Sequence, residues 1–455
     1  MQEGVPKQFS NPQEEIEYLR HRIAERERAL LSRTPEVDAA DRETVGRQEI
    51  REYTSFTPKM VLHKEYEMHP EDVAHSSEAI KIAMDPVEEI LNLAQEKGIK
   101  NALTVLSRVE NAFIVDEVHR KLIEMVHSGV QLADLKEGMR PWHLLHMTLY
   151  EVTMPAQIAP NGQQYQIADL VGMMQQLFSG LRTIGSVKPG NHFVIEVAVA
   201  DHSSDVIFYV SVPNEFTALF EKQTHSLFPN AVLTVQPHDY NIYIDEGTTL
   251  AAEFRLMKHS IYPLKKFEEF SADPLAVLLN AFSKIDHDGT GAAIQFVIRH
   301  PAKIYRENFQ DIIKDVEKGM SPKEAIVHNT VSGEFMSIVA NVFKYKKDDE
   351  EKTKIVDQHV LERLKSKIAT ELVEVNIRMV VSSKDAVKAE QIITQIQSTF
   401  NQFNDPVANS FVTKTLKGKG LLLAQKAFAF RQFSKKRSFV LSIAELATLI
   451  HFPAN

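Results

Sequence analysis

The chain has 455 residues, of which 44% are hydrophobic and 25% charged, with a formal net charge of −9 and no cysteine. This length exceeds one ordinary hydrophobic core, so we expect several domains. The absence of cysteine excludes disulfides, thiolate metal sites, iron–sulfur clusters and cysteine nucleophiles, and it fits a reducing compartment. No apolar run approaches the roughly 18–20 residues that span a bilayer, and residues 1–19 lack the apolar core of a signal peptide. We therefore expect a cytoplasmic protein without direct membrane insertion, peripheral to a membrane only through a partner.

Residues 1–75 are predicted to contain one helix followed by a linker. Asn11 as N-cap, Pro12 as first helical residue and Glu14 as capping partner mark the start of a helix over 11–33. Among its many charges runs a narrow aliphatic stripe, which consists of Ile16, Leu19, Ile23 and Leu30. The stripe favours pairing with another helix, in self-association or partner contact. The alternative is a charged surface helix.

Residues 76–140 are predicted to form a small helical domain. Asp85-Pro86 begins one helix and Gly98 ends it. Apolar residues at helical spacing continue over 101–108 and 116–126, which is typical of a layer of two to four helices.

Residues 141–245 change to the alternation of strands, with period two. The predicted strands cover 144–153, 193–199, 206–212 and 232–235. Helices are predicted at 168–181 and after Asn214, which we interpret as an N-cap. The order βαββαβ is that of a ferredoxin-like module.

The same order recurs over residues 246–415. The predicted strands cover 250–257, 293–299, 372–381 and 411–413. Helices are predicted after Asp273-Pro274 and after Ser383, and a helical insertion at about 303–369 interrupts the pattern. The predicted fold class is therefore α+β, with two tandem ferredoxin-like modules and a basic C-terminal extension over 416–455. Within that extension, Ser442 with Glu445 is expected to begin a last short helix.

No stretch carries a recognisable catalytic signature. The chain has no GxxxxGK loop, no HExxH and no GxSxG, and Asp288-Gly289-Thr290-Gly291 is expected to be a turn. We therefore assign no catalytic residue, cofactor or metal ligand from the sequence. An enzyme of unrecognised type stays open as an alternative.

The segment 406–444 has no acidic residue and is the best candidate for contact with nucleic acid or an acidic partner. Its cationic residues can contact phosphates, and they are Lys414, Lys417, Lys419, Lys426, Arg431, Lys435, Lys436 and Arg437. Phe428, Phe430 and Phe433 lie among them and offer faces on which bases could stack. The alternative is a strand or helix whose phenylalanines belong to the core and whose lysines are solvated.

Several stretches between residues 78 and 455 resemble, in their order, a bacterial family best known from candidate-phyla-radiation bacteria. Its members precede, or are encoded near, HerA/TraG-like ATPases of conjugation and type IV secretion. The stretches include Lys97–Leu103 with Asp116–His119, Trp142 with the strand ending at Pro155, Phe193–Pro213, Pro263 with Asp273–Leu275 and Ile294–Arg299, and Glu445–Pro453.

This resemblance implies a non-catalytic docking or scaffold module for a HerA/TraG-like DNA-translocating ATPase, which is supplied by another chain or fused downstream. None of the matching stretches is catalytic, and ATP hydrolysis does not carry over because the chain has no P-loop. A module that binds nucleic acid directly is the alternative.

Overall fold

The computed structural model describes residues 76, 86–97, 99–127, 145–155, 165–187, 191–200, 203, 205–236, 239–286, 289–329 and 358–453. The chain divides into two compact units, and the first contains α5 (Pro86–Lys97) and α6 (Ile99–Leu106). The second contains α7 (Ala112–His127) and every described element after it. The predicted helical domain over residues 76–140 groups α7 with α5 and α6 instead. Its boundaries stay a prediction. The predicted pairing stripe of Ile16, Leu19, Ile23 and Leu30 lies outside the described residues.

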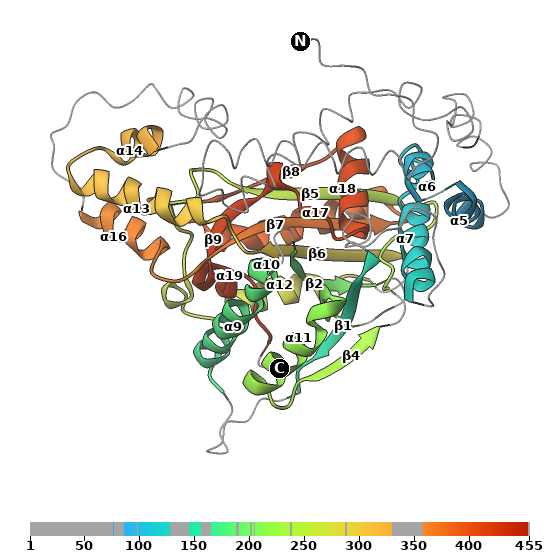
Figure 1. Ribbon diagram of the computed structural model, residues 1–455, viewed down its shortest axis with the longest axis horizontal. Helices are drawn as coiled ribbons and strands as arrows, with labels where there is room; N and C mark the ends of the chain where they lie inside the picture. Colours follow the sequence, from blue (N-terminus) through green and yellow to red (C-terminus); the bar gives the residue numbers. More distant parts are fainter. Residues whose placement is uncertain are drawn as a thin grey trace, which may run out of the picture. The chain divides into compact units, whose positions relative to one another are not determined.

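Nine strands of the second unit form one antiparallel sheet, which confirms the α+β class (Figure 1). The strand order is β4-β1-β3-β2-β6-β7-β5-β8. The short β9 pairs with residues 372–375 of β7, and β5 pairs with residues 378–383 of the same strand. The strands are β1 (Met147–Thr153), β2 (Phe193–Val199), β3 (Ile207–Pro213), β4 (Val232–Gln236), β5 (Thr248–Leu256), β6 (Thr290–Arg299), β7 (Leu372–Ser383), β8 (Phe411–Thr415) and β9 (Phe439–Ser442).

The strands β2 and β6 join the two halves of this sheet, from the Phe193–Ile298 pair to the Val199–Ala292 pair. The period-two alternation predicts the strands but not this pairing. Both strands are buried along almost their whole length, so the central strands are covered on both faces.

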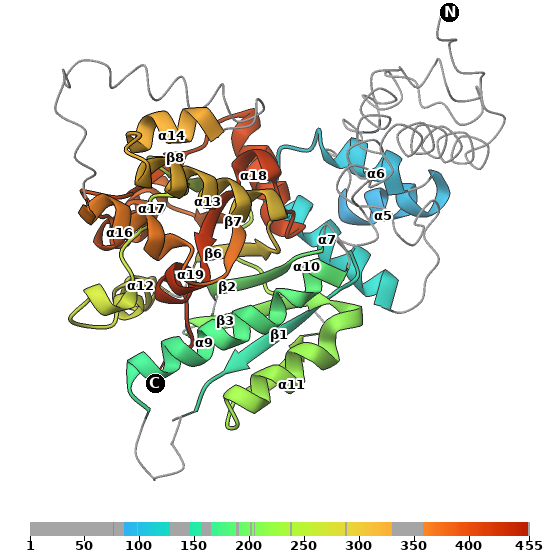
Figure 2. The ribbon, with the colours of Figure 1, turned by 60° about the vertical axis from the view of Figure 1, so that its left-hand side comes forward.

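One face of the sheet, which we call the α9 face, packs against five helices in a single hydrophobic core. These are α9 (Ile167–Leu181), α11 (Thr217–Leu227), α12 (Pro274–Phe282), α17 (Ala386–Thr399) and α19 (Ile443–Leu449), and the short α10 (Thr183–Val187) follows α9. The sheet contributes alternate residues, such as Val373, Val375 and Ile377 of β7. Figure 2 shows α9 and α11 lying along β1 and β3.

The opposite face, which we call the α18 face, carries α7, the segment 240–244 and α18 (Lys419–Ala429). Its apolar contacts are fewer: Tyr243 and Phe428 pack over Ala251, Ala293 and Val380. The rest of this face is polar and is described below.

The predicted insertion is helical in its described part and consists of α13 (Lys303–Glu317), α14 (Pro322–Asn329) and α16 (Gln358–Lys367) (Figure 1). These helices have their own small hydrophobic cluster, which reaches Leu372 of β7 and Val440 of β9. Short 3-10 turns complete the fold: η1 (Asn214–Phe216), η2 (Phe267–Glu269), η3 (Phe400–Phe403) and η4 (Lys435–Arg437). Among the described helices, none combines the length and apolar character needed to cross a bilayer.

The predicted helix starts are confirmed at Asp273 and Ser442 and wrong at two other places. The Asp273 side chain accepts from the Leu275 N–H at 2.8 Å, as an N-cap should. Ser383 belongs to β7, and α17 is capped two residues later by Asp385. Asn214 opens the 3-10 turn η1 and accepts from the Thr148 hydroxyl at 2.9 Å instead of capping α11.

The predicted C-terminal extension is built into the fold through a buried capping box. Glu445 Oε2 accepts from the Ser442 N–H at 2.6 Å and from Lys367 Nζ at 2.7 Å, and Glu445 Oε1 accepts from the Leu264 N–H at 2.7 Å. Lys367 and Glu445 are both fully buried. The last helix is therefore tied to α16 of the insertion by a desolvated ion pair.

Replacing Lys367 with alanine should lower the free energy of unfolding by about 3–5 kcal/mol, because Glu445 would remain as an unpaired buried carboxylate. Urea denaturation measures the loss. Lys365→Ala is the matched control, since Lys365 is half exposed and pairs at the surface with Glu317, where a pair contributes about 1 kcal/mol or less. Equal losses in the two variants would contradict the role of the buried pair.

Candidate interaction surface

A row of polar side chains crosses the α18 face from strand to strand. In register order it consists of Glu151 (β1), Tyr209 (β3), Glu196 (β2), Gln295 (β6), Arg378 (β7), Glu253 (β5) and Lys414 (β8). All but the two ends are buried. Buried polar groups are costly unless they are paired, so this row requires partners from whatever covers it.

The C-terminal segment 428–437 supplies many of those partners. Gln295 Nε2 donates to Glu196 at 2.6 Å and to the Phe428 carbonyl at 3.0 Å. Arg378 donates to the Gln432 carbonyl, and burial lowers its pKa to about 10. At the next strand Arg437 pairs with Glu253. The segment is thus held to the sheet by polar contacts along the row.

Arg431 ends α18 in a left-handed backbone conformation, with φ of +47°. Its N–H donates to the Phe428 carbonyl at 3.0 Å, and the Gln432 N–H donates to the Ala427 carbonyl at 2.8 Å. These two bonds make a Schellman C-cap, where glycine is favoured because it has no Cβ. An arginine at this position costs roughly 1–2 kcal/mol, so its side chain must offset that cost.

The Arg431 guanidinium bridges two buried carboxylates. Nη2 lies 3.0 Å from Glu196 Oε2 and 2.8 Å from Asp239 Oδ1, and Nη1 lies 2.5 Å from Asp239 Oδ2. Burial alone would lower the pKa of Arg431, but the charges of Asp239 and Glu196 raise it well above its ordinary value. The same cation holds the pKa of Asp239 down against the effect of burial. The Arg431 guanidinium therefore stays ionised, and it joins three segments that are distant in sequence.

Helix α7 packs on the same cluster through Asp116 and His119. His119 Nδ1 lies 3.9 Å from Asp239 Oδ2, and the His119 ring centroid lies 4.3 Å from that of Phe430. Burial lowers the pKa of His119 to about 3, although Asp239 opposes the shift. Burial, reinforced by Asp239, raises the pKa of Asp116 well above its ordinary value. His119 is therefore neutral at pH 7.

This cluster contains the residue types of an acid–base site but is closed to solvent. His119 is 1% exposed and Glu196 is also 1% exposed, so a substrate has no path to either in this structure. The His119–Asp239 distance is too long for the hydrogen bond that would orient a catalytic histidine. In the part of the chain that the structure describes, no cluster of His, Asp or Glu could hold a metal ion. We interpret the cluster as an internal network that fixes α7 and α18 on the sheet.

The structure divides the eight predicted contact residues into two groups. Arg431 is buried, Lys426 is half-buried with its pKa lowered by burial, and Arg437 is paired with Glu253. The other five are exposed, and they are Lys414, Lys417, Lys419, Lys435 and Lys436. Their predicted role in binding nucleic acid or a partner stays a prediction.

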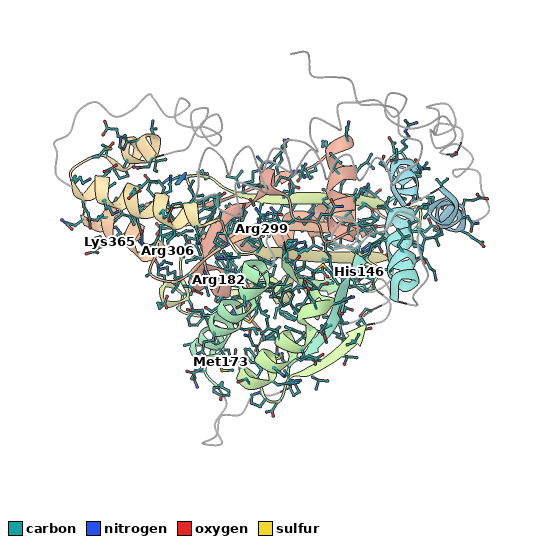
Figure 3. The ribbon with its side chains drawn as sticks, in the orientation of Figure 1. His146, Met173, Arg182, Arg299, Arg306 and Lys365 are labelled. Carbon is teal, nitrogen blue, oxygen red and sulfur yellow. The ribbon has the colours of Figure 1, made fainter. Side chains whose placement is uncertain are left out.

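None of the three predicted stacking residues is fully exposed. Phe428, within α18, and Phe430, its C-cap residue, are buried. Phe433 is half-buried, and the Arg299 guanidinium lies 4.0 Å from its ring centroid. Arg299 lies over the central strands in Figure 3 and also pairs with Glu374. The expectation that the phenylalanines belong to the core therefore holds for Phe428 and Phe430.

Arg255 is an exposed cation of the α18 face that is not among the eight predicted contact residues. It lies on β5 opposite Val412 of β8, on the face of the sheet that carries Glu253 and Lys414. The period-two alternation of β5 could have placed Arg255 there. What the alternation cannot show is that β8 pairs with β5, which brings Arg255 beside the lysine-rich segment.

Replacing Arg431 with methionine should lower the free energy of unfolding by about 3–5 kcal/mol, because Glu196 and Asp239 would lose their buried cation. Urea denaturation measures the change. Lys436→Met is the control, and as an exposed substitution it should stay within about 0.5 kcal/mol of wild type. A loss for Arg431→Met as small as that of the control would show that the two carboxylates do not depend on Arg431.

The buried histidine should make the protein sensitive to acid. The folded-state pKa of His119 is lowered to about 3, while in the unfolded chain it is about 6.5. Between these values the unfolded state binds a proton that the folded state does not, so stability falls as pH falls. His119→Gln should reduce the slope of stability against pH by about one proton, or about 1.4 kcal/mol per pH unit.

Urea denaturation of wild type and His119→Gln at several pH values between about 4 and 8 tests this expectation. Above about pH 7 the histidine is neutral in both states, so that range serves as the internal control. Parallel pH profiles for the two proteins across the acidic range would contradict the assignment.

Comparison with protein-family models matches residues 150–455 to DUF8128, a domain of unknown function. The matched range begins in β1 and includes β2 to β9, together with Arg431 and its partners Glu196 and Asp239. A search of curated proteins found no match. Because the model covers more than half of the chain, the protein belongs to the DUF8128 family.

Proposed function

We propose that each half of the sheet is a ferredoxin-like module. In the first half the elements run β1-α9-β2-β3-α11-β4 and the strand order is β4-β1-β3-β2. In the second half β5-α12-β6-β7-α17-β8 has the order β8-β5-β7-β6, with the helical insertion between β6 and β7. The same fourth-first-third-second order and the placement of all four helices on the α9 face support two tandem modules.

We further propose that the protein is a non-catalytic docking module for a HerA/TraG-like DNA-translocating ATPase of a conjugation or type IV secretion system. One observation carries the non-catalytic part. The acid–base groups gathered on the α18 face are buried: Arg431 is ion-paired with Glu196 and Asp239, and the His119 ring packs against Phe430. The assignment of the partner rests on the sequence resemblance.

The docking proposal is tested by a pull-down from lysate of the source cells with the whole chain as bait, with and without nuclease. We expect a HerA/TraG-like ATPase to be retained after nuclease treatment, because protein–protein docking does not need DNA. Purified ATPase and purified chain should then form a complex by analytical ultracentrifugation. Loss of the ATPase on nuclease treatment would overturn direct docking, and so would two purified proteins that sediment separately.

Direct binding of nucleic acid is the second candidate function. The observation that favours it is the set of five exposed lysines in a segment, 406–444, that contains no acidic residue. Cations placed in this way attract phosphates without reading the bases. The two candidates are compatible, because a module docked on a DNA-translocating enzyme could also contact its DNA.

A further inference from the structure

The exposed cations of the C-terminal segment gather with Arg255 at one edge of the α18 face. Lys414 is the register partner of Glu253, and Arg255 lies two residues further along β5. Arg437 pairs with the same Glu253, so the turn η4 with Lys435 and Lys436 is brought to this edge. Lys417 and Lys419 follow β8 directly at the start of α18. We call Arg255, Lys414, Lys417, Lys419, Lys435 and Lys436 the basic surface.

The backbone of the basic surface is fixed to the sheet at several points. The Leu416 N–H donates to the Ala251 carbonyl at 2.9 Å, just beyond the last β5–β8 pair. Asn376 of β7 donates to the Ser434 carbonyl at 2.9 Å and accepts from the Ser434 N–H at 2.6 Å. The spacing of the cations is therefore set by the fold and does not depend on a ligand to order it.

Among the described residues, the carboxylate that lies between these cations is neutralised. Glu253 is buried and pairs with Arg437. Among the described ion pairs, none involves Arg255 or the five lysines. The surface thus presents uncompensated positive charge on a chain whose net charge is −9. This concentration of charge points to a polyanionic partner.

In the part of the chain that the structure describes, the surface offers cations but no exposed aromatic side chain on which a base could stack. Phe428 and Phe430 are buried, and Phe433 is half-buried with the Arg299 guanidinium against its ring. No described phenylalanine or tyrosine is exposed, and the uncharged side chains exposed beside the cations include the aliphatic Val412 and Met257. Proteins that bind single strands combine a basic groove with exposed aromatic side chains. A duplex instead carries about one phosphate per 1.7 Å of its axis and can be held through its backbone alone.

We propose that the basic surface binds the phosphate backbone of duplex DNA without reading its sequence, an inference that rests on the nucleic-acid-binding candidate above. Contacts to phosphates alone give affinity that depends on ionic strength and not on base sequence. With up to six phosphate contacts, the logarithm of the binding constant should fall against the logarithm of the salt concentration with a slope of about −5.

The test is fluorescence anisotropy of a labelled DNA duplex of mixed sequence, titrated with the whole chain at several salt concentrations. The wild-type affinity should fall about a thousandfold between about 50 and 200 mM salt. The triple variant Lys414→Gln, Lys417→Gln, Lys419→Gln should flatten the slope to about −3. The control neutralises three exposed lysines elsewhere, Lys222, Lys284 and Lys303, and should keep the wild-type slope.

Arg255→Gln tests whether DNA binds the folded surface or only the basic C-terminal segment. Arg255 is remote in sequence from that segment and joins its lysines only in the folded protein. We expect it to reduce the steepness of the slope by about one. Arg306→Gln is its matched control, since Arg306 is an exposed arginine on α13, in the helical insertion (Figure 3). An unchanged slope for Arg255→Gln, or an equal change for Arg306→Gln, would overturn the proposal that the basic surface binds DNA.

Two further results would also overturn the proposal. One is a labelled single strand that binds as tightly as the duplex or more tightly, which would show recognition of bases. The other is the absence of duplex binding at about 50 mM salt, where phosphate contacts are strongest. Neither result affects docking to the ATPase, which the nuclease-treated pull-down tests separately.

Discussion

The ion pairs of Arg431 with Glu196 and Asp239 are the constraint on which the α18 face depends. The arginine occupies a left-handed position at the end of α18 that ordinarily favours glycine. Its side chain joins β2, the segment after β4 and the C-terminal segment, and His119 of α7 packs beside it. Removing one partner of such a network would leave a buried charge uncompensated.

This network explains why a segment rich in lysine and arginine is part of a folded face and not a loose tail. Arg431 and Arg437 neutralise acidic residues of the polar row, and the backbone carbonyls of Phe428 and Gln432 satisfy Gln295 and Arg378. The lysines between these anchors are left at the surface. The same stretch therefore has two parts, one that holds the fold together and one that is available to a partner.

The sequence predicts those features that depend on local periodicity. The alternation over 372–381 corresponds to β7, whose alternate residues enter the core. Asp273-Pro274 and the Ser442–Glu445 pair begin helices, because a cap needs only neighbouring residues. The pairing of β2 with β6 and of β9 with β7 depends on contacts across long stretches of chain, and the four residues of β9 are too few to show a period.

The candidate surface is predictable only in part for the same reason. The absence of acidic residues over 406–444 is visible in the sequence and marks the lysines. Whether a given cation is buried depends on the acidic residue opposite it: Arg431 meets Glu196, which lies on a strand more than two hundred residues earlier. The phenylalanines are likewise interspersed with lysines in the sequence but separated from them in space, because α18 turns Phe428 toward Tyr243 and the sheet.

Native-state hydrogen exchange tests the central claim, that α18 is part of the cooperative core and not a peripheral helix. If the Arg431 network anchors it, the amides of α18 should exchange with the same free energy of opening as those of β7, through global unfolding. Exchange of the α18 amides at a much lower free energy, while β7 stays protected, would contradict the account. That result would mean that the C-terminal segment opens on its own and that the polar row of the sheet does not need it.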